Sequence, residues 1–135
     1  MNPKMDKIPV EYQDLLADET RAIAFLATTM KDGTPQVTPV WFNTDGTHIL
    51  VNSAQGRVKD RNMRARPQVA LAIIAPDAAY RYLQIRGRVV EVTTQGAAEH
   101  ISILSQKYEG KDYDLPAGMV RVIYKIIPER VSGSG

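Results

Sequence analysis

A cluster of basic residues in the middle of the chain stands where a folding rule disfavours it. Residues 51–66 read VNSAQGRVKDRNMRAR, and the pattern predicts a helix that opens with Arg57, Lys59 and Arg61. The N-terminus of a helix carries a partial positive charge and favours acidic residues, so cations there cost stability, which Asp60 offsets only in part. A phosphate held by the helix N–H groups and the basic side chains would remove the conflict. Because such local departures often mark functional sites, the segment predicts a phosphate-binding site.

Other catalytic or metal-binding chemistry has little support in the sequence. The chain has no cysteine and two histidines, His48 and His100, and neither histidine has the Ser and Asp neighbours of a hydrolytic triad. Two isolated histidines without thiols make a poor metal site, so we expect no metal and interpret both as structural. Phosphate-binding groups without acid–base or nucleophilic groups are typical of a protein whose chemistry resides in a cofactor.

Length, charge and hydropathy narrow the class of protein. The 135 residues suffice for a single domain, residues 1–135, without repeats or linkers. The formal net charge is only +2 and no aromatic residues are interleaved with the basic helix, so we expect no nucleic-acid partner. No window approaches a membrane span, and no apolar signal region follows residues 1–4, which predicts a soluble cytoplasmic protein without a membrane partner.

The elements that must position the basic helix are mostly strands joined by tight turns. Strands are predicted over residues 23–30, 35–42, 48–52, 68–75, 82–92 and 120–127. Helices are predicted over residues 9–17, 57–66 and 96–108, the last capped by Thr94. This order predicts a mainly β (α+β) fold: a six-stranded antiparallel barrel with flanking helices.

Several local features refine this prediction. The strand over residues 68–75 is nearly all apolar, so we expect both of its faces to be buried, and Gly87 predicts a bulge. Pro39 lacks an N–H group and places its strand at an edge or a bulge. Residues 132–135 read SGSG and predict a flexible tail. The basic residues Arg61, Arg64 and Arg66 are interpreted as solvated.

Three segments, in this order, resemble the flavin- and deazaflavin-binding split-barrel superfamily named after pyridoxamine 5′-phosphate oxidase. They read FLATTMKDGTPQVTPVWF, LVNSAQGRVKDRNMRARPQVAL and APDAAYRYLQIRGRVVEV. The resemblance covers residues 22–131 and is strongest to the short branch that uses coenzyme F420. It implies a six-stranded antiparallel split barrel that forms a homodimer, with two cofactor sites in clefts between the subunits.

The resemblance also implies roles for individual residues. At the phosphate end, Arg57 and Lys59 would bind the phosphate, and Asn62 would support the site from the helix. Ser53 and Ala54 would line the phosphate and ribityl region.

Further residues would surround the tricyclic ring. The strand beneath the ring would contain Thr38, Pro39, Val40 and Trp41. The residues that close the ring pocket, some of them from the partner subunit, would be Ala75, Pro76, Tyr80 and Tyr82. Arg121 would lie near the polyglutamate tail of a deazaflavin. From the residues alone, Trp41 could equally be core, and the two tyrosines could plug the barrel end.

These observations predict a coenzyme F420-dependent reductase that transfers hydride to an activated double bond in an enone- or quinone-like small molecule. One alternative is an FMN-binding oxidase or flavin reductase of the same fold. Another is a non-catalytic coenzyme F420-binding protein. Pyridoxamine phosphate oxidation is not expected, because the final segment PERVSGSG does not match the substrate-binding segment of that oxidase. The sequence identifies no catalytic side chain.

Overall fold

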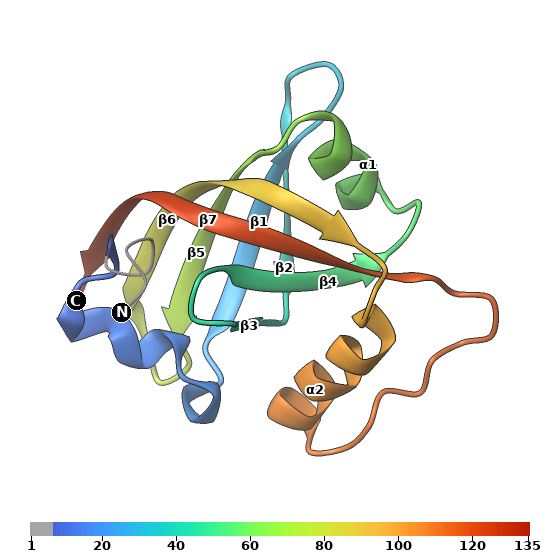
Figure 1. Ribbon diagram of the computed structural model, residues 1–135. Helices are drawn as coiled ribbons and strands as arrows, with labels where there is room; N and C mark the ends of the chain where they lie inside the picture. Colours follow the sequence, from blue (N-terminus) through green and yellow to red (C-terminus); the bar gives the residue numbers. More distant parts are fainter. Residues whose placement is uncertain (1–6) are drawn as a thin grey trace.

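The computed structural model describes residues 7–135, which form one antiparallel sheet with helices beside it (Figure 1). The strands are β1 (Ile23–Thr29), β2 (Pro35–Val40), β3 (Phe42–Thr44), β4 (Ile49–Ala54), β5 (Gln68–Ala75), β6 (Ala78–Thr93) and β7 (Arg121–Ser134). The helices are η2 (Val10–Leu16) and η3 (Asp18–Thr20), both 3₁₀, and the α-helices α1 (Val58–Ala65) and α2 (Ala97–Glu109). Within residues 7–135, no helix is long and apolar enough to cross a membrane. The expectation of no signal region concerns residues 1–4, which lie outside the described residues.

The order of strands explains why the sheet curls. The order is β2-β1-β5-β6-β7-β4-β3, so β2 and β3 form opposite edges of the sheet. In the chain, however, only Trp41 separates these two strands. The two edges must therefore approach each other, and the sheet bends into a half-barrel that remains split at Trp41.

This split corrects the sequence prediction of one strand over residues 35–42. The chain crosses there from one sheet edge to the other, so the described residues form a seven-stranded sheet rather than a six-stranded one. The edge position predicted for Pro39 is confirmed, because β2 is an edge strand in which Pro39 pairs only with Phe25.

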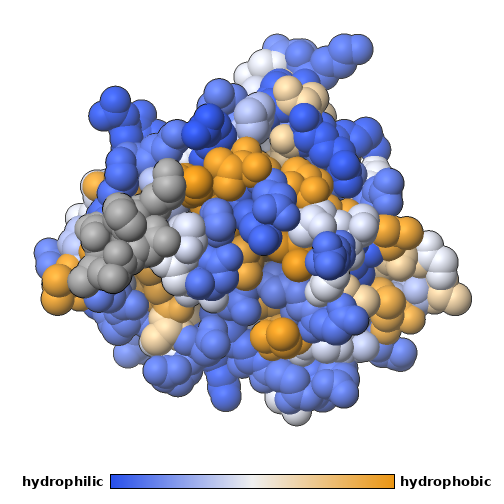
Figure 2. Space-filling model, in the orientation of Figure 1, coloured by the Kyte–Doolittle hydropathy of each residue, from blue (hydrophilic) through white to orange (hydrophobic). Residues whose placement is uncertain are grey.

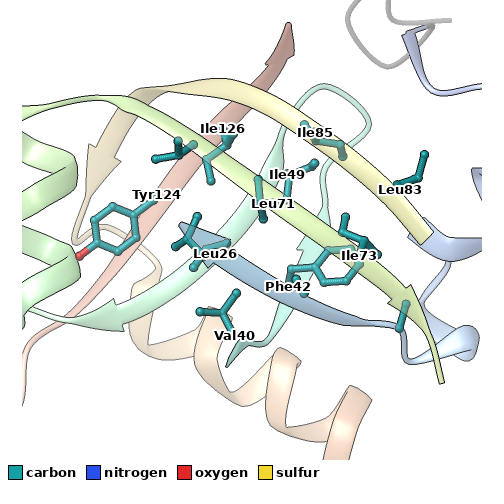
Figure 3. Close-up of a cluster of buried hydrophobic side chains, with 14 of the residues drawn as sticks. Leu26, Val40, Phe42, Ile49, Leu71, Ile73, Leu83, Ile85, Tyr124 and Ile126 are labelled. Carbon is teal, nitrogen blue, oxygen red and sulfur yellow. The ribbon is translucent and has the colours of Figure 1, made fainter. Parts of the chain in front are cut away.

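Alternate residues of the strands fill the inside of the half-barrel. Figure 3 shows this core, in which Leu26, Phe42, Leu71 and Tyr124 are all buried. Burying each such side chain contributes about 1.5–3 kcal/mol. The outward residues of β5 are only half-buried in the single chain, so the prediction that both faces of residues 68–75 are buried is wrong for the described chain. On the face seen in Figure 2, most residues are hydrophilic and hydrophobic ones gather near the centre.

The two longest strands, β6 and β7, cross the whole half-barrel as a pair. Their register shifts between Arg86 and Gly87, which confirms the predicted irregularity at this glycine. A Cβ atom at Gly87 would lie 2.3 Å from the carbonyl oxygen of Ile127, so the strands can approach this closely only at a glycine.

The prediction of a flexible SGSG tail is wrong. Strand β7 continues to Ser134, which pairs with Tyr82 of β6. Backbone hydrogen bonds to the long neighbouring strand order these residues whatever their side chains are. Gly133 lies so close to Tyr12 of η2 that a Cβ atom there would be 2.2 Å from the ring.

Two further helix predictions need correction. Residues 10–16 form a 3₁₀ helix rather than an amphipathic α-helix, and within it Leu15 is buried whereas Val10 is exposed. Helix α2 begins within one residue of its predicted start, but Thr94 does not cap it through its side chain. Gly96 takes the N-cap position with a φ of 75°, and the N–H of Ala97 donates to the carbonyl of Thr94.

Candidate functional site

A cleft of about 580 Å³ opens where the half-barrel is split, beside α2 and the start of α1. This volume is within the range of small-molecule sites, about 300–1,000 Å³. Strands β1, β2, β4 and β7, both α-helices and the loop after α2 all contribute to its wall. The lining residues are Ile23, Pro39, Val40, Trp41, Asn52, Ser53, Arg57, Lys59, Ile101, Tyr108, Glu109, Tyr113 and Arg121.

Three cations share the wall of this cleft. Arg57 is the N-cap residue of α1, Lys59 lies in its first turn, and Arg121 begins β7. Burial lowers the pKa of Lys59, and the nearby positive charges of Arg57 and Arg121 lower it further. Burial also lowers the pKa of Arg121, and repulsion from Arg57 lowers it further. Within residues 7–135, the side chains of Arg57 and Lys59 have no hydrogen-bond or ion-pair partner. Such a cluster is unfavourable by itself and suits a bound anion.

A buried carboxylate holds the turn that carries these cations. Asp60 is 2% exposed and accepts hydrogen bonds from the N–H of Gly56 (2.9 Å), from Nε of Arg64 (2.9 Å) and from the hydroxyl of Tyr124. Figure 3 shows the Tyr124 side chain reaching toward α1. Asp60 therefore fixes the turn and forms its ion pair with Arg64. Its negative charge is not paired with the cations that line the cleft.

The other basic residues of the segment are all hydrogen-bonded. Arg61 and Arg64 are exposed, which agrees with their interpretation as solvated, whereas Arg66 is half-buried, which corrects it. Arg61 donates to the carbonyl of Gly56, and Nε of Arg66 donates to the carbonyl of Thr29 at 2.7 Å. Arg64 donates to Asp60. Arg66 therefore attaches α1 to β1, whereas Arg61 and Arg64 bond to the turn before α1 and to α1 itself.

The end of β4 adds a polar group to the cleft. Ser53 is buried and lines the cleft, and its Oγ atom has no hydrogen-bond partner among the described residues. A hydroxyl buried without a partner is costly unless a ligand or water bonds to it. Ala54 lines a neighbouring, more open pocket that shares Arg57 with the cleft. Both residues belong to β4, which extends two residues beyond the strand predicted over residues 48–52.

Aromatic side chains line another part of the cleft. The rings of Trp41 and Tyr108 are stacked, with centroids 5.5 Å apart and an interplanar angle of 11°. The hydroxyl of Tyr108 donates to the carbonyl of Ala22 at 2.8 Å, and burial raises its pKa to about 12, so the hydroxyl keeps its proton at neutral pH. The guanidinium of Arg121 lies 5.3 Å from the centroid of the Tyr113 ring. These aromatic surfaces suit a flat, apolar ligand group.

The structure brings half of the sequence-predicted site residues together on this cleft. They are Pro39, Val40, Trp41, Ser53, Arg57, Lys59 and Arg121. Thr38 adjoins the cleft on β2 but does not line it. Asn62 is buried beneath the site, where its Nδ2 donates to Oγ1 of Thr28 at 3.0 Å and so attaches α1 to β1.

Four predicted residues lie elsewhere, at the hairpin between β5 and β6. Ala75, Pro76, Tyr80 and Tyr82 do not line the cleft of the single chain, and Tyr80 is 88% exposed. A contribution of these residues from a partner subunit stays a prediction.

Sequence reasoning missed other lining residues. Tyr108 stands at the end of the helix predicted over residues 96–108, where its spacing indicates only an apolar position, and Tyr113 lies in a polar loop that carries no recognisable signal. Asn52 did offer a signal, because an amide stands there at the end of an otherwise apolar strand run.

Known proteins resemble this chain in sequence and in fold. The profile of the family described as pyridoxamine 5′-phosphate oxidase matches residues 8–134. A solved structure of an F420 reductase is 36% identical, with a TM-score of 0.82, and the match covers 93% of this chain and 98% of that chain. No curated protein matches the sequence.

More distant structures share the fold. The conserved hypothetical protein Rv2991 from Mycobacterium tuberculosis is 20% identical over 94% of this chain and 85% of its own, with a TM-score of 0.73. The heme storage protein HutZ from Vibrio cholerae is 17% identical over 93% of each chain, with a TM-score of 0.65. At these identities the likeness shows the fold alone.

Proposed function

Because the chain belongs to the pyridoxamine 5′-phosphate oxidase family, we propose that it is a coenzyme F420-dependent reductase acting on an enone- or quinone-like small molecule. The observation that carries the proposal is a single cleft whose wall contains two kinds of surface. One is formed by Arg57 and Lys59, which have no side-chain partner among residues 7–135, and the other by the stacked rings of Trp41 and Tyr108. A cofactor with an anionic group and a planar ring needs both surfaces.

The part of the cleft lined by Arg57, Lys59 and Arg121, its cation end, fits a phosphate group. Arg57 and Lys59 can each donate charge-assisted hydrogen bonds, and the Ser53 hydroxyl can donate another. A phosphate there would replace the mutual repulsion of three cations by attraction. Arg121 would add a third positive charge from β7.

The aromatic part of the cleft fits a planar ring. Val40 and Ile101 supply apolar surface there, and the Trp41–Tyr108 stack adds a flat one. Such a surface excludes water and orients the ring relative to a second reactant.

The bound deazaflavin would supply hydride transfer, so the chain itself need contribute little acid–base chemistry. His100, which bonds to the cleft-lining Asn52, is buried and hydrogen-bonded on both ring nitrogens. Burial and the charge of Arg121 lower its pKa to about 4, so it is neutral at pH 7 and suits a structural role. The protein then acts by binding, orientation and exclusion of water.

The choice of cofactor leads to a direct prediction. We expect coenzyme F420 to bind more tightly than FMN, because its glutamyl tail adds negative charge to a site rich in cations, and we expect its affinity to fall as salt concentration rises. Fluorescence titration of both cofactors measures this difference.

Three outcomes separate the candidate functions. Tighter FMN binding, or a yellow protein on purification, would favour the FMN oxidase or flavin reductase. Binding of coenzyme F420 without reduction of any enone or quinone by its reduced form would favour the non-catalytic binding protein. Tight coenzyme F420 binding together with acceptor reduction is the expected result.

We also propose that the protein is a homodimer formed through the outer face of the sheet. The register aligns Ile23, Ile74 and Tyr82 in one row across β1, β5 and β6, and Ile23 also lines the cleft. Val37, 62% exposed, lies on the same side of the neighbouring edge strand. A second copy that covers this apolar face would therefore border the cleft.

Light scattering tests the dimer. We expect about twice the chain mass of 15.0 kDa, and we expect Ile74→Asp to give a monomer with weakened coenzyme F420 binding. Ile103→Asp, on the exposed side of α2, is the matched control and should leave the dimer intact. A monomeric protein that binds the coenzyme with full affinity would contradict the proposal.

A further inference from the structure

Asn52 lies where β4, β7 and α2 meet beneath the cation end of the cleft. Its Oδ1 accepts a hydrogen bond from Nε of Arg121 at 2.8 Å. Its Nδ2 donates to the carbonyl of Ala97 at 3.0 Å and to Nδ1 of His100 at 3.0 Å. One buried amide thus bonds a cleft-lining cation on one side and helix α2 on the other.

The partners of Asn52 leave only one orientation of its amide. Arg121 can only donate, so the amide oxygen must face it, and the Ala97 carbonyl can only accept, so the amide nitrogen must face α2. Both amide N–H groups are then used. An aspartate would lack the donors, and a leucine would lack both the donors and the acceptor.

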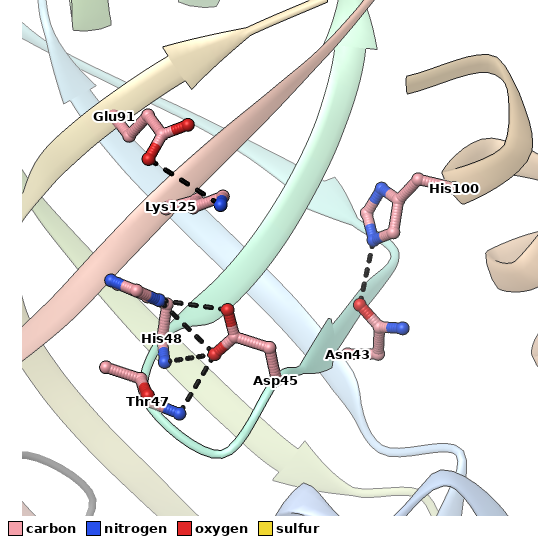
Figure 4. Close-up of polar contacts among 7 residues, drawn as sticks. All are labelled: Asn43, Asp45, Thr47, His48, Glu91, His100 and Lys125. Carbon is pink, nitrogen blue, oxygen red and sulfur yellow. Dashed lines mark hydrogen bonds and ion pairs between the residues drawn. The ribbon is translucent and has the colours of Figure 1, made fainter. Parts of the chain in front are cut away.

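The histidine continues the same network. Because Nδ1 of His100 accepts from Asn52, its proton resides on Nε2, which donates to Oδ1 of Asn43 at 2.8 Å. Figure 4 shows this contact between α2 and β3. A neutral His100 satisfies all of these bonds, so the network fixes α2 against β3 and β4.

Asn52 leaves the outer part of the Arg121 guanidinium available to a ligand. Nε is held by Asn52, and Nη1 contacts the sulfur of Met119 at 3.4 Å. Nη2 has no partner among residues 7–135. The residue is only 7% exposed although it lines the cleft, so its position depends on the contacts behind it.

We propose that Asn52 is a positioning residue that aims Arg121 at the anionic group of the ligand and couples that cation to the placement of α2. The inference rests on the proposed function in taking the ligand as coenzyme F420. Since α2 also carries Tyr108, the same amide links the cation end of the cleft to its aromatic part.

The test compares three variants in ¹⁵N-labelled protein. Asn52→Leu removes the acceptor of Arg121, and we expect the dispersed, slowly exchanging Nε–H signal of Arg121 to disappear. Coenzyme F420 affinity should fall about tenfold to a hundredfold, as expected for a charge-assisted contact. Asn43→Ala is the matched control: it removes the other partner of His100 without touching Arg121, so the Arg121 signal and the affinity should stay within about twofold.

Asn52→Asp keeps the test decisive if Asn52→Leu does not fold. The carboxylate still accepts from Arg121, so its Nε–H signal should remain, whereas the donors to α2 are lost. A carboxylate beside Nδ1 favours the protonated ring, so the pKa of His100 should rise from about 4, with His48 as the internal reference. Coenzyme F420 affinity should fall, because the new charge cancels one cation.

Each outcome decides the inference. An unchanged Arg121 signal and an unchanged affinity in Asn52→Leu would overturn the positioning role, and an unmoved His100 pKa in Asn52→Asp would overturn the coupling to α2. If the unaltered protein binds no coenzyme F420 but Asn52→Leu still loses the Arg121 signal, the positioning role stands and the proposed function fails.

Discussion

The double variant Arg57→Ala, Lys59→Ala is expected to bind coenzyme F420 about a hundredfold to ten-thousandfold more weakly than the unaltered protein. Each side chain should supply one charge-assisted contact of about 1.5–3 kcal/mol, so each single variant should lose about tenfold to a hundredfold. Neither side chain bonds to the described part of the protein, so nothing in the fold replaces them. Fluorescence titration at fixed ionic strength measures the loss.

The stability of this variant distinguishes a binding role from a structural one. We expect its free energy of unfolding to equal or exceed that of the unaltered protein. Removing the two charges ends the burial of the Lys59 ammonium, which lowers its pKa, and also relieves the repulsion between the cations, which lowers that pKa further. The control Lys31→Ala, Arg88→Ala removes the same charge outside the cleft and should bind normally. Equal affinity of the Arg57 and Lys59 variant and the unaltered protein would rule out the phosphate site.

The second large effect is on stability: Asp60→Ala should lower the free energy of unfolding by about 3–5 kcal/mol at pH 7. The substitution leaves the Tyr124 hydroxyl and the Gly56 N–H without partners in a buried position, and it deprives Arg64 of its carboxylate. Urea unfolding at pH 7 measures the change. Asp112→Ala is the control, because this exposed carboxylate accepts one hydrogen bond from the described residues, that of Gln106, and should change stability by less than about 0.5 kcal/mol.

The pH dependence of this difference follows from the pKa of Asp60. Burial alone would raise that pKa, but hydrogen bonds from Tyr124, Gly56 and Arg64 outweigh it and lower the pKa below 3.8. A group whose pKa is lower when folded stabilises the protein above its unfolded pKa and loses that contribution as pH falls through the folded value. The difference between the unaltered protein and Asp60→Ala should therefore be full at pH 7 and shrink below about pH 3.8. A difference that stays constant from pH 7 to pH 3 would contradict this account.

The basic helix start that lines the cleft could be predicted from sequence because its signal is local. Arg57 and Lys59 lie within three residues of one another, at the end of a helix where cations are unfavourable, and the preceding turn is short. The strands and both α-helices were predictable for the same reason, since hydrophobic periodicity and turn residues act over a few positions. These features depend on neighbours along the chain.

The remaining features depend on neighbours across the fold. Trp41 appears in the sequence as one residue of a continuous strand, and only closure of the half-barrel makes it the point where two sheet edges meet. The tail pairs with β6 because a long partner strand lies beside it, which its own Ser and Gly residues do not indicate.

The sequence by itself therefore determined that this protein carries a cluster of cations at a helix start on a mainly antiparallel β fold. The resemblance implied a site role for Arg121, but only the tertiary structure decided that it lies beside that helix start across 64 positions of chain, that Tyr108 stacks on Trp41, and that Asn52 holds Arg121. The physical reason is that local preferences act over one or two turns of chain, whereas the cleft is assembled by the packing of α2, β4 and β7.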